Sequence, residues 1–452
     1  MTAVWCELAW LGGEAADAGV LIEIEGERIA SVRRGVPARG AVPAVAYASA
    51  EDAPLCEAAE GVVPDAVLPG LTLPGLANAH SHAFQRALRG RTHAGTGSFW
   101  TWREQMYALA ATLDPDACFA LSRAAFGEMA LAGITCVGEF HYLHHAPDGR
   151  PYEDANAMGL AVLAAAREAG LRITLLDACY LRGGIDRFRD AGAHAWAERV
   201  DALAEPPAAR VGAAIHSVRA VDPESARVVA EWAEGRPLHA HVSEQPKENE
   251  ECLAAHARTP TGLLAEAGAL SERFTAVHAT HLTDEDVALL GGATVTACLC
   301  PTTERDLADG IGPARRLLDA GAALATGSDS QAVIDPFEEA RAVELDERLA
   351  GGVRGVHAAA ELLRAATASG YAALGWPEGG RIEPGALADL TAVSLDGVRL
   401  AGARPEETIP SVVFAAAAAD VRDVMVGGRW VVRDGEHVTL DVAAELRAAM
   451  TA

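Results

Sequence analysis

The middle of the chain alternates short apolar runs with longer segments of helical period. Eight apolar runs can be followed along it: Leu71–Ala79, Ile134–Phe140, Arg172–Tyr180, Arg210–Ser217, Pro237–Val242, Phe274–Thr280, Thr294–Cys300 and Ala322–Ser328. The segments between them place apolar residues three and four positions apart, as amphipathic helices do. Clear examples are Pro115–Ala132, Glu153–Ala169 and Pro223–Glu234. Eight strand–helix units over roughly 300 residues predict an α/β fold of the (β/α)8 TIM barrel type.

An open, doubly wound sheet is the alternative arrangement of such units. In its dinucleotide-binding form, a glycine-rich GxGxxG turn follows the first strand. No such turn follows Leu71–Ala79, where the chain continues as His80-Ser-His82. The pattern therefore favours the barrel.

Both ends of the chain are rich in short strand candidates. Near the N-terminus, Val20–Glu25 and Ile29–Val32 flank a Gly-Glu-Arg turn, which predicts a hairpin. The C-terminal candidates are Leu390–Leu395, Asp420–Val426 and Trp430–Asp434. The stretch Arg39–Pro64 is rich in alanine, proline and glycine and is predicted to be a loop. We therefore predict a small β-sandwich domain formed by residues 1–70 and 382–452, with the barrel at residues 71–381.

Composition and charge restrict the class of function. The chain of 452 residues has a net charge of −26 and a pI near 4.9, which argues against nucleic acid or a membrane as its main partner. It has no uncharged run of 18 apolar residues and no basic-then-apolar leader, so we expect a cytoplasmic location. The eight cysteines form no CxxC pair, which favours free, buried thiols.

Lys247 is the only lysine of the chain. A Schiff base to pyridoxal phosphate, or a carboxylated lysine between two metal ions, would have to use this one position. The chain contains no Walker-type phosphate loop. Every other strongly basic side chain is an arginine.

Histidines and one aspartate follow several of the predicted strands. His80 and His82 leave the first run two positions apart, so their imidazoles can point to the same side of the strand. His241 ends the fifth run, His278 the sixth, and Asp329 follows the eighth. In a barrel these strand ends meet at one rim, where active sites of this fold lie. Three histidines and an aspartate can hold zinc and leave one position for water.

A lone His-x-His pair would be weak evidence, and the metal prediction depends on the combination of strand ends. His239, two residues before His241, is either a spare ligand or a partner of a ligand. Iron or manganese could also occupy such a nitrogen and oxygen site. The remaining histidines, apart from His216, are expected on the surface or in packing: His93, His141, His144, His145, His194, His256, His281, His357 and His437.

These residues carry a family resemblance. The motifs are Pro74-Gly75-Leu-Ala-Asn78-Ala-His80-Ser-His82, His241-Val-Ser-Glu244, Val277-His278-Ala-Thr-His281 and Gly327-Ser328-Asp329. They resemble the deaminase branch of the amidohydrolase superfamily, and the resemblance extends to the β-rich ends. It implies a distorted barrel and a mononuclear zinc site held by His80, His82, His241 and Asp329.

The position of the lysine supports a single metal ion. Relatives with two metal ions bridge them with a carboxylated lysine at the fourth strand. Here the fourth run ends in Ile215-His216-Ser217, and Lys247 lies after the fifth run. We therefore predict one Zn²⁺ per chain.

A closer resemblance is to the formimidoylglutamate deiminase family. Its motifs are His82-Ala-Phe-Gln85-Arg86, Phe99-Trp-Thr-Trp-Arg103, Gly138-Glu-Phe-His-Tyr142, His216-Ser-Val-Arg219 and Cys300-Pro-Thr-Thr-Glu. The resemblance implies hydrolysis of N-formimidoyl-L-glutamate to N-formyl-L-glutamate and ammonia in histidine degradation. It also implies a homodimer. The segment 41–67 is longer than usual for the family.

The resemblance implies a catalytic role for three residues. Asp329 would accept a proton from water, and Glu244 would carry a proton to the departing nitrogen. His278 would hydrogen-bond the attacking oxygen and stabilise its charge.

The expected substrate carries two carboxylates, and arginine can bind a carboxylate by two parallel hydrogen bonds. By the resemblance, Gln85, Arg103 and Tyr142 would hold one carboxylate. His216 and Arg219 would hold the other.

Two other functions remain open at this point. A related deaminase could act on an aminated ring such as guanine, cytosine, a triazine or S-adenosylhomocysteine, and Trp100 and Trp102 could stack on that ring. A non-catalytic zinc-binding barrel is the alternative of another class. It would be expected to lack Glu244, His278 or Asp329, and all three are present.

Overall fold

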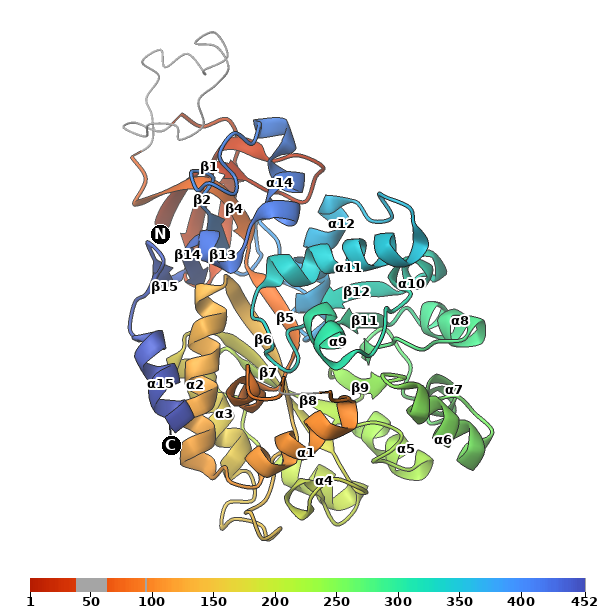
Figure 1. The fold of residues 1–452 in the computed structure, drawn as a ribbon. Helices are drawn as coiled ribbons and strands as arrows, with labels where there is room; N and C mark the ends of the chain where they lie inside the picture. Colours follow the sequence, from red (N-terminus) through yellow and green to blue (C-terminus); the bar gives the residue numbers. More distant parts are fainter. Residues whose placement is uncertain (38–62, 94–95, 452) are drawn as a thin grey trace.

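The eight apolar runs of the middle region form eight parallel strands of one sheet (Figure 1). Each strand pairs with the next in chain order, as the predicted barrel requires. The strands are β5 (Leu76–Ser81), β6 (Ile134–His141), β7 (Arg172–Cys179), β8 (Ala209–Ile215), β9 (Leu238–Val242), β10 (Phe274–His278), β11 (Thr296–Leu299) and β12 (Ala323–Thr326). The (β/α)8 prediction is confirmed. The computed structural model describes residues 1–37, 63–93 and 96–451, so most of the predicted loop Arg39–Pro64 lies outside the described residues.

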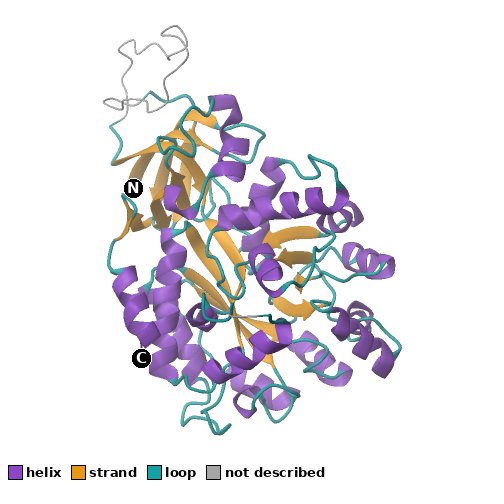
Figure 2. Cartoon of the chain, in the orientation of Figure 1, coloured by secondary structure: helices purple, strands orange, loops and turns teal. Residues whose placement is uncertain are grey.

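Helices surround the barrel strands (Figure 2). The three helices predicted above begin where local chemistry favours a start: Asp114 and Asp222 cap α2 and α5, and a proline follows each cap. α3 begins at Ala157, later than predicted, because Asp154 accepts a hydrogen bond from the Asn156 N–H and holds a turn before it. The barrel-region helices are α1 (Phe99–Ala110), α2 (Pro115–Leu131), α3 (Ala157–Glu168), α4 (Ala193–Asp201), α5 (Pro223–Trp232), α6 (Pro246–His256), α7 (Pro260–Glu266), α8 (Asp284–Gly292), α9 (Pro301–Leu307), α10 (Ala314–Ala320), α11 (Pro336–Gly351), α12 (Ala359–Arg364) and α13 (Gly370–Ala373), with the short helices η1 (Ala83–Leu88), η2 (Asp186–Phe188) and η3 (Ala365–Ser369).

The barrel closes between its first and last strands at the carboxyl ends only. There the backbone N–H of His82 donates to the carbonyl of Asp329, and the Asp329 N–H donates to the carbonyl of His80, each at 3.0 Å. Gly327 makes this approach possible, because a Cβ at that position would lie 2.7 Å from the carbonyl oxygen of His80. The closure therefore occurs at the residues singled out as metal ligands.

A second eight-stranded sheet is built from both chain ends and lies at one end of the molecule (Figure 1). Its order is β16-β15-β14-β13-β4-β1-β2-β3, so β4 from the N-terminal part pairs with β13 from the C-terminal part. The sheet bends back on itself through a bridge between Arg28 and Leu387, and a separate apolar core fills its inside. This is the predicted small β domain. Its strands are β1 (Thr2–Ala9), β2 (Asp17–Glu25), β3 (Arg28–Arg33), β4 (Ala66–Pro74), β13 (Leu390–Val393), β14 (Val421–Val426), β15 (Arg429–Arg433) and β16 (Glu436–His437).

Four helical segments of the C-terminal region were not predicted. They are η4 (Pro405–Glu407), α14 (Thr408–Ala415), η5 (Ala418–Asp420) and α15 (Val442–Thr451). α15 packs against α2 of the barrel, where Arg123 binds Glu445 at 2.5 Å.

The first predicted run, Leu71–Ala79, is divided between the two sheets. β4 continues to Pro74 in the terminal sheet, and β5 starts at Leu76 in the barrel. Gly75 lies at the crossing and donates its N–H to the carbonyl of Asp389 at 2.8 Å. A side chain at Gly75 would collide with Thr135, since its Cβ would lie 2.2 Å from the Thr135 hydroxyl.

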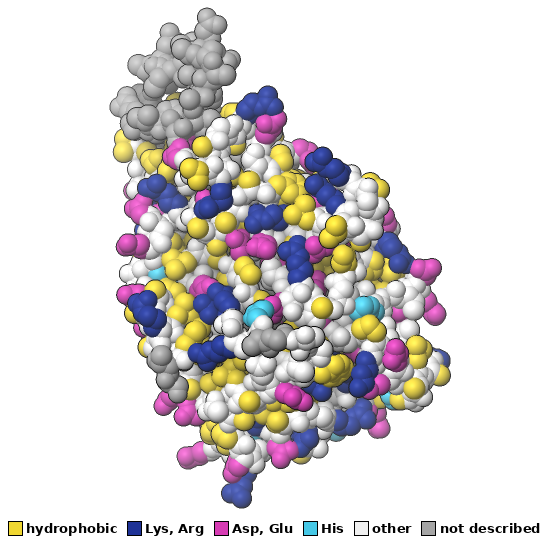
Figure 3. Space-filling model, viewed as in Figure 1, with side chains coloured by type: hydrophobic (Ala, Val, Ile, Leu, Met, Phe, Trp, Pro, Cys, Tyr) yellow, Lys and Arg dark blue, Asp and Glu magenta, His cyan; other side chains and the backbone are white. Residues whose placement is uncertain are grey.

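The distribution of charged side chains, cysteines and apolar helices can be compared with what the composition predicts. Basic and acidic side chains are interspersed on the face shown in Figure 3. The seven cysteines among the described residues are free and buried, as predicted. None of the helices in the described ranges combines the length and apolarity needed to cross a membrane.

A buried ion pair joins the two parts of the fold. Arg172 at the start of β7 donates to Asp389, just before β13, from Nε at 2.7 Å and from Nη2 at 3.3 Å. The same carboxylate accepts from Tyr371 Oη and from the Gly427 N–H. Both charged side chains are almost completely buried. Removing one partner of such a pair leaves an uncompensated charge in the interior.

The Asp389→Ala variant is therefore expected to lose about 3–5 kcal/mol of unfolding free energy. Denaturant unfolding followed by tryptophan fluorescence measures the loss. The control is Glu266→Ala, which removes the exposed pair with Arg258 and is expected to leave the unfolding free energy nearly unchanged. Equal losses in the two variants would contradict the importance of the buried pair.

Candidate metal centre and active site

Four side chains converge at the carboxyl-terminal rim of the barrel. His80 is the last residue but one of β5, and His82 directly follows that strand. His241 lies in β9, and Asp329 follows β12. Their candidate ligand atoms all lie within 4.8 Å of one another, and all four residues are buried. Asp329 Oδ1 lies 3.3 Å from His80 Nε2 and 3.4 Å from His82 Nε2, and His241 Nε2 lies 3.2 Å from His80 Nε2. The sequence-predicted ligand set is therefore brought together.

Backbone carbonyls orient two of the imidazoles. His82 Nδ1 lies 2.8 Å from the carbonyl of Phe140, and His241 Nδ1 lies 2.8 Å from the carbonyl of His216. Each Nδ1–H is thus occupied, which leaves the Nε2 lone pair free to face the centre of the cluster. Hydrogen bonds of this kind fix the tautomer and the direction of metal-binding histidines.

Burial also keeps these imidazoles in the form that can bind a cation. Desolvation lowers the pKa of His80 and His241 well below the ordinary value, and neighbouring histidines lower both further. Desolvation lowers the pKa of His82 as well, although Asp329 opposes the shift. Neutral imidazoles with one carboxylate form a donor set that suits a divalent ion.

His278, at the end of β10, lies next to the cluster and among carboxylates. Its Nε2 is 3.8 Å from Asp329 and 3.7 Å from Glu244, and its Nδ1 is 3.4 Å from Glu304. Burial by itself lowers the pKa of His278, but Glu244, Glu304 and Asp329 together raise it well above the ordinary value. A protonated imidazole here is a hydrogen-bond donor aimed at the metal cluster.

Several rim residues adopt the left-handed backbone conformation that non-glycine residues avoid. The φ angle is +66° at His278, +52° at Ser243 and +41° at Asp329. Such conformations cost about 1–3 kcal/mol each and gather at functional sites. His278 ends β10, whereas Ser243 and Asp329 follow β9 and β12, where the chain turns and directs side chains into the rim.

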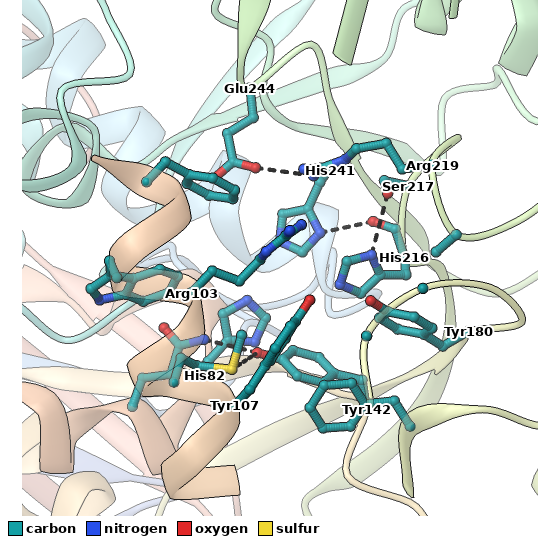
Figure 4. Close-up of a pocket in the computed structure, with 18 of the residues that line it drawn as sticks. His82, Arg103, Tyr107, Tyr142, Tyr180, His216, Ser217, Arg219, His241 and Glu244 are labelled. Atoms are coloured by element: carbon teal, nitrogen blue, oxygen red, sulfur yellow. Dashed lines mark hydrogen bonds and ion pairs between the residues drawn. The ribbon is translucent and has the colours of Figure 1, made fainter. Parts of the chain in front are cut away.

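A pocket opens onto the cluster, and the predicted substrate residues line it. Gln85 comes from η1, Arg103 from α1, and Tyr142 follows β6, while His216 and Arg219 follow β8. In Figure 4, Arg103 reaches from α1 into the middle of the pocket, toward His241. All the predicted site residues except His80 line this pocket, and His80 lies fully buried beneath it.

The two predicted carboxylate-binding arginines differ in their partners. Arg103 stacks on Trp100 with its guanidinium 4.4 Å from the ring centre, and no carboxylate among the described residues pairs with it. Arg219 instead contacts two carboxylates, Glu244 at 3.2 Å and Glu248 at 3.7 Å. Arg103 is therefore open to an incoming anion, whereas Arg219 is already held beside Glu244.

The remaining predicted side chains have local partners. Gln85 Nε2 donates to Tyr142 Oη at 2.9 Å, and His216 Nδ1 lies 3.3 Å from the Ser217 hydroxyl. His239 lies two residues before His241 on β9, and its Nε2 donates to the carbonyl of Ala373 at 3.0 Å. His239 is not part of the ligand group.

The sequence did not predict the pocket residues Tyr107, Tyr180 and Arg182. It also did not predict Glu304, which lies outside the pocket lining and contacts His278. Tyr180 follows β7, and its position as the last residue of the predicted run Arg172–Tyr180 was the available signal. Tyr107 lies on α1, and its direction into the pocket depends on how that helix packs. Glu304 ends the Cys300-Pro-Thr-Thr-Glu304 motif, but only the fold brings it to His278.

A second cluster of histidines does not favour a metal ion. His141, His144 and Asp177 lie close together and are buried. The Asp177 carboxylate, however, is bound by Arg199 at 2.8 and 2.9 Å. The guanidinium already compensates the carboxylate charge and would repel a cation. These histidines therefore belong to packing, as predicted.

Comparisons with known proteins agree on one protein family. The family model described as "Amidohydrolase family" matches residues 71–431. The chain is 39% identical over 393 residues to a formimidoylglutamate deiminase of Pseudomonas aeruginosa, covering 82% of this chain and 86% of that protein. The crystal structure of an amidohydrolase from Brucella melitensis superposes with a TM-score of 0.86 at 31% identity, covering 100% of this chain and 99% of that one. An adenosine deaminase from Xanthomonas campestris with bound zinc shares the fold, with a TM-score of 0.82, 23% identity and coverage of 100% and 97%.

Replacing His241 by glutamine is expected to weaken the binding of a divalent ion more than about 100-fold. Loss of a residue that only hydrogen-bonds a ligand weakens metal binding by roughly 10- to 100-fold, and His241 is itself a candidate ligand. The substitution removes one of four converging donors. Elemental analysis after dialysis, together with a chelator competition, measures this. His239→Gln is the matched control on the same strand, because an amide can still donate to the Ala373 carbonyl. Equal metal loss in both variants would mean that His239 is also a ligand.

Proposed function

Because this chain belongs to the amidohydrolase family, we propose that it is a hydrolase that converts N-formimidoyl-L-glutamate and water to N-formyl-L-glutamate and ammonia, a step of histidine degradation. The relative named formimidoylglutamate deiminase is 39% identical over most of both chains. The observation that carries the proposal is the arginine-lined pocket over the histidine–aspartate cluster, in which Arg103 has no carboxylate partner among the described residues. A dicarboxylate substrate supplies that partner.

We propose one Zn²⁺ per chain, bound by His80, His82, His241 and Asp329. Three neutral imidazoles and one carboxylate are typical zinc donors. The direction given to His82 and His241 by backbone carbonyls supports this donor set. A zinc-containing neighbour of the same fold supports the choice of metal. When bound, the ion supplies Lewis-acid activation of a water molecule near neutral pH.

The protein side chains then handle the protons. Hydrolysis forms a C–O bond at the amidine carbon and breaks its C–N bond to the terminal nitrogen, which leaves as ammonia. Asp329 accepts a proton from the attacking water, and Glu244 delivers a proton to the leaving nitrogen. His278 donates a hydrogen bond to the oxygen that develops charge, which its carboxylate surroundings favour.

The substrate carboxylates bind at two positions of the same pocket. Gln85, Arg103 and Tyr142 hold one of them, and His216 with Arg219 holds the other. Arginine is suited to this task because its planar donors match a carboxylate in two parallel bonds. Since Arg219 also contacts Glu244, it links substrate binding to the residue that moves a proton.

A deaminase of an aminated ring is the second candidate. Phe99, Trp102, Tyr107 and Tyr180 line the pocket, and aromatic walls can stack on a flat ring. The arginines favour the dicarboxylate, because a neutral ring gives Arg103 no counter-charge. A non-catalytic zinc-binding barrel would not need Glu244 and His278 at the cluster.

The cytoplasmic location and the homodimer stay predictions from the sequence. Fractionation of the native host and light scattering of the purified protein measure them.

The zinc-loaded protein is expected to release ammonia from N-formimidoyl-L-glutamate with a higher kcat/KM than from adenosine, guanine or cytosine. Glu244→Gln should keep zinc and lose about 10²–10⁴-fold in kcat, because a proton donor to the leaving group is removed. Glu251→Gln, on the exposed face of α6, is the control with unchanged turnover. A preference for one of the rings would overturn the assignment in favour of the second candidate.

Arg103→Met should raise KM for the dicarboxylate by roughly 10- to 150-fold with little change in kcat, since hydrogen bonds to charged groups are worth about 1.5–3 kcal/mol. Arg219→Met should change both KM and kcat, because its guanidinium also holds Glu244. Arg103→Lys, which keeps the charge and loses the paired geometry, should fall between wild type and Arg103→Met. Steady-state kinetics test the series, and an unaltered KM in Arg103→Met would remove Arg103 from the substrate site.

A further inference from the structure

A chain of buried hydrogen bonds lies behind the metal ligands and has no part in the proposed chemistry. It consists of Asn78, Ser81, Glu139, Ser328 and Gln331, and we call it the backing network. We propose that the backing network, centred on Glu139, positions His82 and Asp329 and so sets the affinity of the metal site. This inference rests on the proposed metal centre and goes beyond it, because none of the five residues is a ligand or touches the substrate pocket.

Glu139, on β6, holds the residues on both sides of His82. Its Oε2 accepts from the Ser81 hydroxyl at 2.6 Å, and its Oε1 accepts from the backbone N–H of Ala83 at 2.7 Å. The next residue of β6, Phe140, accepts from His82 Nδ1 through its carbonyl. Two successive residues of β6 therefore fix both the backbone and the ring direction of this ligand.

Gln331 extends the same network to Asp329. Its Nε2 donates to the Ser81 hydroxyl and to the backbone carbonyl of Asp329, both at 2.9 Å. Its Oε1 accepts from the Ser328 hydroxyl at 2.7 Å. A single side-chain amide thus connects the strand that carries His80 to the segment that carries Asp329.

Asn78 completes the network at the start of the Gly327-Ser328-Asp329 turn. Its Nδ2 donates to the Ser328 hydroxyl at 2.6 Å, and its Oδ1 accepts from the Ser328 N–H at 2.9 Å. The result is a continuous connection from β6 through β5 to the end of β12. Each of its hydroxyl and amide groups has a defined partner and direction.

Burying the carboxyl group of Glu139 costs free energy, because the group loses its contact with water. This cost suggests that Glu139 has a role at this position. Its exposed fraction is 3%, and no cationic side chain among the described residues pairs with it. Burial raises the pKa of Glu139 to about 8, although the bonds from Ser81 and Ala83 lower it. What Glu139 contributes is its geometry, since its two carboxyl oxygens contact the residues on either side of His82.

The backbone around Asp329 is strained, and the backing network contacts it. Asp329 and Gln331 have φ angles of +41° and +60°, in the left-handed region. Backbone strain of this kind persists only where the surroundings enforce it. The bonds from Gln331 to Ser81 and to the Asp329 carbonyl help to hold this backbone, together with the Thr303 hydroxyl, which accepts from the Ser330 N–H at 3.1 Å. Weakening the Gln331 bonds is therefore expected to let the Asp329 carboxylate move.

The test compares zinc affinity in Glu139→Gln and Ser81→Ala with that of wild type. Glutamine has the same size, but its amide cannot accept from both the Ser81 hydroxyl and the Ala83 N–H. Ser81→Ala removes only the hydroxyl that joins Glu139 to Gln331. Both variants are expected to bind zinc about 10- to 100-fold more weakly, as measured by competition with a chromogenic chelator.

Glu339→Gln is the matched control. Glu339 is equally buried and accepts from one hydroxyl and one backbone N–H, both of Thr302, which is not adjacent to a ligand. It should lower the melting temperature of the metal-free protein about as much as Glu139→Gln and leave zinc affinity unchanged. A purely structural role for Glu139 would make the two glutamine variants alike in both measurements.

The outcomes separate this inference from the proposed function. If wild type binds no zinc, the metal centre itself is wrong. If wild type binds zinc and both network variants bind it within twofold of wild type, the positioning role is overturned while the metal centre stands. If Glu139→Gln does not fold, Ser81→Ala decides alone, because loss of one hydroxyl leaves no large cavity.

Discussion

Between β12 and β5 the barrel is joined by backbone hydrogen bonds of His80 and His82 with Asp329, and these are three of the four candidate ligands. The hydrogen bonds that join the two strands therefore also place the candidate ligands. Gly327 permits it by letting the chain pass against the backbone of His80. In a TIM barrel closed by hydrogen bonds along the whole length of its first and last strands, the closure would not depend on the residues that carry the candidate ligands. Here, a disturbance of the closure is a disturbance of the site.

The pocket above this closure separates charges in a way that suits a zwitterionic substrate. Carboxylates surround His278 beside the cluster, whereas Arg103 reaches in from α1 on the other side. The amidine end of the proposed substrate carries positive charge and its other end carries two carboxylates. The field of the pocket can therefore orient the molecule before any atom reacts. The overall charge of −26 does not prevent this, since the local groups are close and buried.

Much of the fold could be predicted because each barrel strand is a nearly continuous apolar run, and polar residues mark where each run stops. The candidate site residues could be predicted for the same reason, because His241, His278 and Asp329 stand where the apolar runs end. The division of Leu71–Ala79 at Gly75 could not, since both halves are equally apolar and only the partner strands differ. The pairing of Arg219 with Glu244 and the contact of Glu304 with His278 depend on loop geometry. Glu139 and Gln331 lie far apart in the chain, and nothing local indicates that Ser81 joins them.

The pairing of β4 with β13 has a consequence for how the protein is made. β4 is synthesised early, and the strand that completes its edge is among the last parts of the chain. Until then the N-terminal strands present an open, apolar edge on the ribosome, which is prone to wrong association. Until then Arg172 at the start of β7 also lacks its partner, because Asp389, just before β13, supplies the opposite charge. A truncated chain that keeps every active-site residue but stops before β13 would therefore be a substrate for chaperones or proteases instead of a working enzyme.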